Sequence, residues 1–237
     1  MITSLQNSLI KDIAKLNQKK YRHITNTFII EGEHLIEEAL KHQIIKTIIT
    51  TEKHPKYKDA LIVSESVMKK LTSTHHLPTV IAVCNMMSKK HLSDRVLILE
   101  HIQDPGNLGT LLRSALAFGF TTVVLDDSVD LYNPKVLRST QGALFHLSFL
   151  TMSARAFKDK YPEYTLIATA VHSKTTTKKP KGKYALILGN EGSGIQAETL
   201  AISDATITIP ITNMESLNVA VAGSIIMYQL NGIPFMK

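Results

Sequence analysis

The fold is decided by residues 184–230, which read YALILGNEGSGIQAETLAISDATITIPITNMESLNVAVAGSIIMYQL. The apolar run at 185–188 predicts a buried strand, and residues 189–194 (GNEGSG) predict a glycine-rich loop directly after it. A second strand is predicted at 205–209, followed by a polar loop and an apolar helix at 217–230. In open α/β sheets, ligands bind in the crevice outside the carboxyl ends of the strands, where such loops lie. The stretch therefore predicts an α/β fold with a ligand site.

The helix predicted at 217–230 contains no charged residue, which indicates an element buried on more than one side. A membrane span also needs ~20 mainly apolar residues. Here the apolar run is interrupted at Asn218, Ser224, Gln229, Asn231 and Gly232. We therefore predict a buried helix of a soluble protein and no association with a membrane.

Cysteine and histidine usage argues against disulfides and metal sites. The single Cys84 has no partner within the chain, and the ten histidines include no His-Glu-x-x-His pattern. Residues 1–17 mix charged and apolar side chains, unlike a secretory signal. We expect a protein of the reducing cytoplasm without a bound metal.

The net charge of +7 is concentrated in the first part of the chain. Residues 1–93 contain 14 basic and 8 acidic side chains, whereas residues 94–237 contain 13 and 12. A polyanion such as a nucleic acid is therefore expected to bind mainly to the amino-terminal part. The alternative is that these lysines only keep a small domain soluble.

An amphipathic helix is predicted close to the amino terminus. Its apolar stripe consists of Leu5, Leu9, Ile13 and Leu16. If the helix continues as far as residue 22, its basic residues form a row on another face: Lys11, Lys15, Lys19 and Arg22. Such a row can contact successive phosphates of a nucleic acid. The alternative is an ordinary solvated helix face.

Strands and helices alternate along the chain and divide it into two predicted domains. In residues 1–90, strands are predicted at 28–30, 44–50, 60–63 and 79–83, with helices at 31–41 and 65–71 after the amino-terminal helix. In residues 94–237, further strands are predicted at 96–99, 121–125, 147–150 and 166–170. Continuous apolar runs of this kind are typical of parallel strands covered on both faces. The polar stretch at 86–94 marks the boundary, and a basic loop is predicted at 174–183.

One arginine stands out on the helix predicted after the turn at 104–106 (DPG). That helix is expected to begin near Asn107, a favourable cap residue. Its apolar stripe consists of Leu108, Leu111, Leu112 and Ala115. Arg113 points away from this stripe, and its neighbours one turn away, Gly109 and Ala117, are both small. A ligand can therefore approach the guanidinium closely. The alternative is a surface arginine without a role in binding.

Three motifs follow one another in the second predicted domain. They are residues 104–113 (DPGNLGTLLR), residues 188–194 (LGNEGSG), and Ile209-Pro210 followed by residues 216–219 (SLNV). In these motifs the chain resembles the SpoU (TrmH-like) family of RNA 2′-O-ribose methyltransferases, within the SPOUT superfamily. The resemblance spans residues 96–230 and departs at Ala220, where the family often has serine. It implies a parallel-sheet methyltransferase domain with a trefoil knot. Residues 28–33 (FIIEGE) resemble the smaller α/β domain that binds the RNA substrate in many of these enzymes.

The resemblance implies that S-adenosylmethionine is the cofactor and that its methyl group passes to a ribose 2′-hydroxyl of RNA. Backbone groups of the second and third motifs are expected to hold the cofactor. The predicted cofactor-binding residues are Thr169, Leu188, Gly189, Asn190, Gly192, Ile209, Leu217 and Asn218. The residue types agree with this, because an uncharged adenine needs apolar walls and backbone donors, and glycines let the chain come close.

The resemblance also suggests the catalytic residues, which are Arg113, Asn107, Glu191, Ser216 and Asn218. A hydroxyl is a weak nucleophile, so the negative charge that develops on it during attack must be stabilised. Arg113 is assigned to that task and to the adjacent phosphate, because a guanidinium stays protonated and does not act as the base. Glu191 is expected to orient Arg113 by a charge-assisted bond. The two asparagines are expected to position the ribose or the cofactor, and Ser216 to contact the target phosphate.

Three other functions compete with this one. A dinucleotide-dependent oxidoreductase also uses a glycine loop, but here the order is Gly-x-x-Gly-x-Gly and Asp204 precedes its strand instead of following it. An inactive RNA-binding protein is expected to lack Arg113, Asn107 or Glu191, and all three are present. A transfer-RNA methylase is the alternative to a ribosomal-RNA methylase. The extra amino-terminal domain favours ribosomal RNA, by analogy only.

The apolar helix also predicts a homodimer built on the second domain. One side of it carries Leu217, Val221, Ile225 and Tyr228, and other sides carry Val219, Ala222, Ile226 and Leu230. A sheet covers only one face, and soluble monomers rarely expose a large apolar patch. Such a patch is most commonly buried against a second copy of the chain related by two-fold symmetry. The alternative is that other elements of the same chain bury both faces.

Overall fold

The computed structural model describes residues 1–74, 76–87, 91–170 and 180–231. Tertiary contacts divide the chain into two units, Met1–Ser88 with Asp130–Phe145, and Lys89–Val129 with His146–Lys237. The division between Ser88 and Lys89 falls within the boundary predicted at 86–94. Residues 130–145 were assigned to the second domain by sequence, whereas their contacts group them with the first unit. The independent domains 1–90 and 94–237 stay a prediction.

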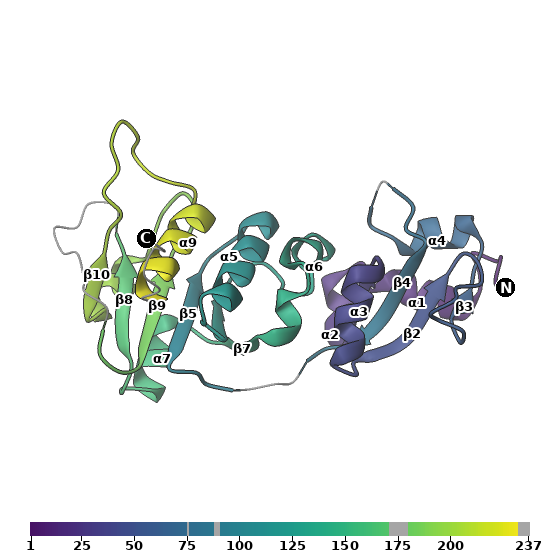
Figure 1. Cartoon of the computed structure of the whole chain (residues 1–237), viewed down its shortest axis with the longest axis horizontal. Helices are drawn as coiled ribbons and strands as arrows, with labels where there is room; N and C mark the ends of the chain where they lie inside the picture. Colours follow the sequence, from purple (N-terminus) through teal and green to yellow (C-terminus); the bar gives the residue numbers. More distant parts are fainter. Residues whose placement is uncertain (75, 88–90, 171–179, 232–237) are drawn as a thin grey trace, which may run out of the picture. The chain divides into compact units, whose positions relative to one another are not determined.

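The first unit is a four-stranded sheet with helices packed on it (Figure 1). The strand order is β1 (Thr27–Glu31), β4 (Val80–Asn85), β2 (Ile45–Thr50) and β3 (Leu61–Ile62). Strand β4 is antiparallel to both neighbours, and β2 is parallel to β3. The helices are α1 (Ser8–Lys15), α2 (Lys19–Thr25), α3 (Glu33–Lys41), α4 (Glu65–Leu71) and α6 (Pro134–Thr140). The alternation predicted for residues 1–90 is confirmed, with small shifts at the ends of the elements.

The first helix is shorter than predicted and buries a different face. It begins after Asn7, whose side chain accepts the N–H of Leu9 at 3.0 Å. Leu5 therefore lies outside the helix, and Leu5 and Leu9 are 40% and 46% exposed. The residues that enter the core are Ile10, Ile13 and Leu16. The predicted stripe was wrong in its first half, because helical spacing holds only from Ser8 onward.

The predicted row of basic residues is broken at Arg22. Helix α1 ends at Lys15 and α2 begins at Lys19, so the two do not share one face. Arg22 is 3% exposed, its Nε donates to Asp130 Oδ2 at 3.1 Å, and its Nη2 forms an ion pair with the same oxygen. Its Nη1 donates to the carbonyl of Leu16 at 2.9 Å. A buried arginine whose three nitrogens all donate to groups of the protein does not contact phosphates, so the prediction for Arg22 was wrong.

The segment Asp130–Phe145 is attached to the first unit along its length, beyond the ion pair at its start. The rings of Tyr132 and Phe28 pack with centroids 4.5 Å apart. Further on, Arg138 Nη1 donates to Ser73 Oγ at 2.8 Å. Helix α6 also packs on strand β1. These contacts complete the core of the first unit with residues that follow it in sequence.

The second unit is a six-stranded parallel sheet. Its strand order is β10 (Ala205–Ile207), β8 (Thr165–Thr169), β9 (Tyr184–Leu188), β5 (Arg95–Glu100), β6 (Thr122–Asp126) and β7 (Ser148–Thr151). The helices are α5 (Pro105–Ala117), α7 (Ala154–Lys160), α8 (Ala197–Ile202) and α9 (Val219–Asn231). All residues of β9 are buried, as expected for a strand covered on both faces. The α/β prediction is confirmed, although β10 ends before the predicted residue 209. Most of the predicted basic loop at 174–183 lies outside the described residues.

Helix α5 begins earlier than predicted. Pro105 is its first residue, and Asp104 caps it by accepting the N–H of Asn107 at 2.8 Å. Proline suits this position because its missing N–H would have no partner in the first turn. The cap is therefore Asp104, and the side chain of Asn107 is left for other contacts.

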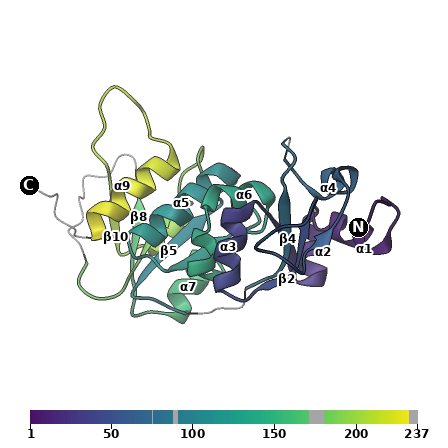
Figure 2. The same ribbon diagram turned by 45° about the vertical axis from the view of Figure 1, so that its right-hand side comes forward.

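Helix α9 lies beside α5 in both views of the ribbon (Figures 1 and 2). At Gly223 the helix packs closely on its neighbours, since a Cβ atom there would lie 2.5 Å from Leu188 Cδ1 and 2.6 Å from Leu111 Cδ2. One face of α9 is thus covered by β9 and α5. On the other side, Val221 is 49% exposed. The helix begins at Val219 and not at the predicted residue 217, so Leu217 lies in the loop before it. Of the helices described, none is long and apolar enough to span a bilayer.

Candidate active site

The glycine-rich loop after β9 is a tight closed turn. Asn190 and Gly194 exchange two backbone hydrogen bonds, each of 3.0 Å. Gly189 precedes this pair, and a Cβ atom on it would lie 2.3 Å from the carbonyl carbon of Gly194 and 2.4 Å from the nitrogen of Ile195. Backbone atoms cannot yield as a flexible side chain does, so only glycine fits at residue 189.

The side chain of Asn190 holds the loop in shape. Its Oδ1 accepts the N–H groups of Gly192 at 2.9 Å and of Ser193 at 3.1 Å. Its Nδ2 donates to the carbonyl of His101 at 2.9 Å, at the end of β5. The amide is therefore committed to the protein, and Asn190 offers a ligand mainly its backbone groups.

Glu191 joins the loop to the start of α5. Its Oε1 accepts from Asn107 Nδ2 at 3.0 Å and from the N–H of Asp104 at 3.3 Å, and its Oε2 accepts the N–H of Gln103 at 3.5 Å. Partial burial disfavours the charged carboxylate, but these hydrogen bonds outweigh it and hold the pKa of Glu191 below its ordinary value. The predicted bond from Glu191 to Arg113 is absent among the described residues, because these groups occupy the carboxylate instead.

Asn107 extends this link to α9. Its Oδ1 accepts from Asn218 Nδ2 at 3.0 Å, while Asn218 Oδ1 accepts the N–H groups of Ala220 at 2.9 Å and Val221 at 3.2 Å. Glu191, Asn107 and Asn218 thus connect the glycine loop, the start of α5 and the start of α9. Sequence motifs far apart in the chain meet in one hydrogen-bonded series.

A cavity of about 180 Å³ lies beside this series, within the second unit. The predicted residues that line it are Thr169, Leu188, Gly189, Asn190, Glu191, Gly192, Ile209, Ser216 and Leu217. Three of the predicted residues do not line the cavity: Asn107, Arg113 and Asn218. The sequence interpretation missed a set of mainly apolar lining residues: Ala170, Gly194, Ile195, Ile207, Ile211, Val219, Ala222 and Ile226. The spacing of 219, 222 and 226 on one helix face was the signal that could have identified part of this wall.

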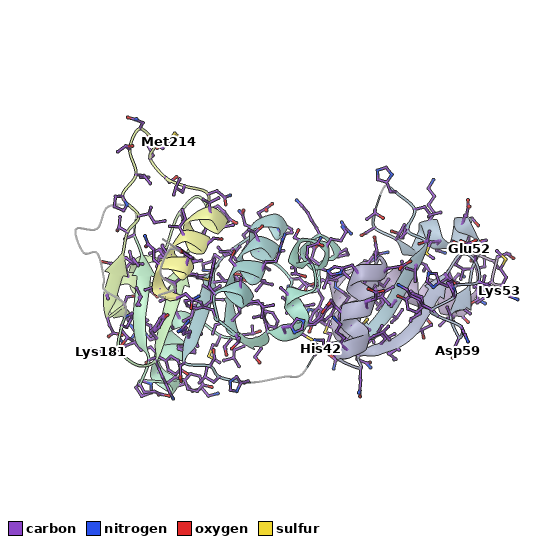
Figure 3. The ribbon with its side chains drawn as sticks, in the orientation of Figure 1. His42, Glu52, Lys53, Asp59, Lys181 and Met214 are labelled. Carbon is purple, nitrogen blue, oxygen red and sulfur yellow. The ribbon has the colours of Figure 1, made fainter. Side chains whose placement is uncertain are left out.

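The cavity suits S-adenosylmethionine in the character of its walls. Apolar side chains from β9, β10 and α9 face backbone groups of the glycine loop, which is the combination that an adenine ring needs. Residues 210–218 close one side as an exposed loop, with Met214 at its tip and 71% exposed (Figure 3). Thr169 and Gly189 stand at the carboxyl ends of β8 and β9, where ligands of parallel sheets bind.

Arg113 projects from the exposed side of α5. Within the described part of the chain, no residue forms a hydrogen bond or ion pair with its guanidinium. Ser216, in the exposed loop, is also accessible. Both side chains are available to an external ligand, as their predicted roles require. The described residues include no group of three or more His, Cys, Asp or Glu side chains that could hold a metal ion.

Replacing Gly189 with alanine is expected to abolish binding of the cofactor product S-adenosylhomocysteine. The added Cβ has no space beside Gly194 and Ile195, so the loop must open and the cavity loses a wall. Calorimetric titration measures the effect, with Ser193→Ala as the control, because Ser193 is exposed in the same loop and does not line the cavity. Equal affinity of Gly189→Ala and the unaltered protein would contradict this account of the loop.

Comparison with known proteins agrees with the geometry. The model of the SpoU rRNA Methylase family matches residues 94–228, and that of the MRM3-like substrate binding domain matches residues 7–82. The 23S rRNA (guanosine(2553)-2′-O)-methyltransferase RlmP of Bacillus subtilis is 39% identical, over 98% of this chain and 99% of its own. A crystal structure of an RNA 2′-O ribose methyltransferase has a TM-score of 0.82 at 31% identity, covering 97% of both chains.

The cofactor is supported by a second structure. The AdoMet-bound rRNA methyltransferase from Sinorhizobium meliloti has a TM-score of 0.85 at 26% identity, covering 97% of this chain and 96% of its own. The protein is thus an S-adenosylmethionine-dependent RNA methyltransferase, and the predicted cofactor is confirmed. With a family model matching more than half of the chain and a relative matching nearly all of it, the chain belongs to the SpoU rRNA methylase family.

Proposed function

We propose that this protein methylates the 2′-hydroxyl of a ribose in large-subunit ribosomal RNA. The observation that carries the proposal is the full-length similarity to a relative named as a 23S rRNA guanosine 2′-O-methyltransferase. The similarity includes the first unit as well as the second, and the first unit is where a substrate RNA is chosen. A transfer RNA remains the alternative substrate within the family.

The cavity between the glycine loop and the 210–218 loop is the proposed site of S-adenosylmethionine. When bound, this cofactor supplies a methyl group activated by its positively charged sulfur. Leu188, Ile209 and Leu217 form apolar walls for the adenine, and the backbone at Gly189 and Gly192 approaches closely. Thr169 and Asn190 line the end of the cavity that lies nearest to strands β8 and β9. The side chain of Asn218 acts from outside the cavity, through Asn107.

Arg113 is proposed to act on the RNA. Its guanidinium grips the phosphate beside the target nucleotide and stabilises the charge that develops on the 2′-oxygen. Support comes from its exposure and from the absence of competing partners among the described residues. Asn107, Asn218 and Glu191 keep α5 and the glycine loop in register, and Ser216 donates its hydroxyl to the target phosphate. These residues bind and orient the substrate. Arg113 does not accept the proton of the 2′-hydroxyl, because its guanidinium is already protonated.

The first unit is proposed to supply most of the RNA affinity. It carries the excess of basic residues, and exposed lysines such as Lys53 extend from the loop before β3, where Figure 3 labels Glu52, Lys53 and Asp59. Lysine contacts to phosphates release counterions, so binding is expected to weaken steeply with salt. The match to a substrate-binding domain model at residues 7–82 supports the same assignment.

Mapping of 2′-O-methylation tests the proposal. RNA from a strain without the gene is compared with RNA from its parent, and one large-subunit site is expected to lose its methyl group. The purified protein with S-adenosylmethionine is expected to restore that site on RNA from the deletion strain. Loss of a methyl group from a transfer RNA alone would establish the alternative substrate.

We also propose that the protein is a homodimer through the exposed side of α9. Val221 lies there, 49% exposed, with Ile225 and Tyr228, which are half-buried, and Tyr228 contacts Phe118 at 5.7 Å between ring centroids. An apolar surface of this kind is usually covered by a partner. A two-fold axis near α5 and α9 would also bring a second copy close to Arg113.

Val221→Lys is expected to convert the dimer into a monomer, because a charge in the centre of an apolar interface cannot be desolvated cheaply. Sedimentation equilibrium of the full chain at micromolar concentration measures the mass. Leu40→Lys is the matched control, since Leu40 on α3 is 45% exposed and lies in the other unit. A monomeric unaltered protein with full activity would exclude the dimer.

The trefoil knot and the cytoplasmic location stay predictions. The knot is supported by membership in the family and by the parallel sheet that the family shares. The location is supported by the RNA substrate class and by the single buried cysteine, which forms no internal disulfide.

A further inference from the structure

A buried carboxylate at the carboxyl end of β5 has no part in the site described so far. Glu100 is 1% exposed. Its Oε2 accepts the backbone N–H of Gln196 at 2.8 Å, and its Oε1 accepts the hydroxyl of Thr199 on α8, which is also buried. Burying a carboxylate costs free energy unless hydrogen-bond donors compensate it, so the bonds from Gln196 and Thr199 are needed to keep Glu100 in this position.

The next residue, His101, contacts the glycine loop through Asn190 and the residue after the loop, Gln196. Its carbonyl accepts Asn190 Nδ2 at 2.9 Å, and its Nε2 lies 2.6 Å from Gln196 Nε2. The backbone of His101 is left-handed, with φ of 56°, and this turns the carbonyl and the ring toward the glycine loop. Residues 100 and 101 therefore hold both ends of the loop, Asn190 near its start and Gln196 just after its end.

The loop end held by Glu100 is also a wall of the cavity. Gly194 and Ile195 line the cavity, and Gln196 is the residue that follows them. Helix α8 begins directly after Gln196, so Thr199 and Gln196 fix the direction in which the chain leaves the loop. If either bond to Glu100 is lost, Ile195 and Gly194 can move away from the space between the loop and α9.

We propose that Glu100 is a positioning residue for the cofactor: through Gln196 and Thr199 it sets the cavity width and hence the affinity for S-adenosylmethionine. The proposal rests on the placement of the cofactor in this cavity. It predicts that Glu100 affects binding of the cofactor and leaves binding of RNA and the rate at saturating cofactor unchanged, because it contacts neither substrate.

The test removes one donor without changing shape. Thr199→Val is isosteric and leaves the carboxylate with one partner fewer, whereas Thr199→Ser keeps the hydroxyl. Thr199→Val is expected to raise the Kd for S-adenosylhomocysteine about tenfold, since a hydrogen bond to a charged group is among the stronger ones. Thr199→Ser is expected to stay within about twofold. The KM for S-adenosylmethionine should rise with the Kd while kcat is unchanged.

A purely structural role gives a different result. Thr199→Val would then lower the thermal unfolding midpoint of the ligand-free protein and leave the Kd well below that temperature unchanged, which overturns the proposal. If Thr199→Val does not fold, Glu100→Gln serves in its place, because it keeps the shape of the side chain. Glu100→Gln is expected to raise the Kd at least about threefold, and an unchanged Kd overturns the proposal equally.

A cavity variant separates this proposal from the placement of the cofactor. Ala222→Leu extends a side chain into the cavity from α9 and is expected to weaken S-adenosylhomocysteine binding strongly. If Ala222→Leu has no effect, the cofactor lies elsewhere and the proposed site is wrong. If Ala222→Leu weakens binding and both Thr199→Val and Glu100→Gln do not, only the positioning role of Glu100 is wrong.

Discussion

Arg113→Ala is expected to lower the rate of methyl transfer by about 100-fold or more, which is typical of losing one group that stabilises charge in the transition state. Arg113 is exposed on α5 and has no partner among the described residues, so removing it disturbs no internal contact. Affinity for S-adenosylhomocysteine should stay the same, because Arg113 does not line the cavity. Single-turnover transfer to the RNA substrate, with tritiated cofactor, measures the change.

Two further variants sharpen this test. Arg113→Lys keeps the charge and loses the planar fork that grips a phosphate with two parallel bonds, so intermediate activity is expected. Arg155→Ala removes another exposed arginine, on α7 of the same unit, and should leave the rate unchanged. Turnover of Arg113→Ala close to that of the unaltered protein would show that another group stabilises the reacting oxygen.

Asp130→Ala is expected to destabilise the first unit by about 3–5 kcal/mol, the usual effect of leaving a buried charge unpaired. Arg22 is 3% exposed and directs Nε and Nη2 at this one carboxylate. After the substitution, the carbonyl of Leu16 is the one acceptor that its guanidinium keeps among the residues that the structure describes. Urea unfolding of the full chain, followed by circular dichroism, measures the change in the free energy of unfolding.

An exposed pair is the matched control for Asp130. Asp12 and Lys15 form a 2.8 Å ion pair on the surface of α1, and Asp12→Ala should have little effect. The double variant Arg22→Met/Asp130→Leu should recover much of the lost stability, because apolar groups of similar size often replace a buried ion pair without loss. A small effect of Asp130→Ala would mean that residues 130–145 are not needed to complete the first unit.

The framework of the second unit followed from local patterns in the sequence. The continuous apolar runs at 96–99 and 185–188 predicted parallel strands buried on both faces, and β5 and β9 lie side by side in the centre of the sheet. The glycines at 189–194 predicted a tight loop, and Gly189 has no room for a side chain. These properties are local, because the apolar character and the backbone freedom of a residue are written in its own type. The loops of the second and third family motifs line the cavity where the cofactor is proposed to bind.

Contacts between distant residues were decided only by the tertiary structure. Arg22 was interpreted as a phosphate contact from its spacing, but its partner Asp130 lies 108 residues away in the chain. Asn190 and Glu191 were expected to face a ligand and Arg113, whereas their side chains hold His101, Gln103, Asp104 and Asn107. Glu100 carried no signal at all in the sequence. A polar side chain in a sequence shows what it can donate or accept, and only the folded chain determines which group comes within 3 Å of it.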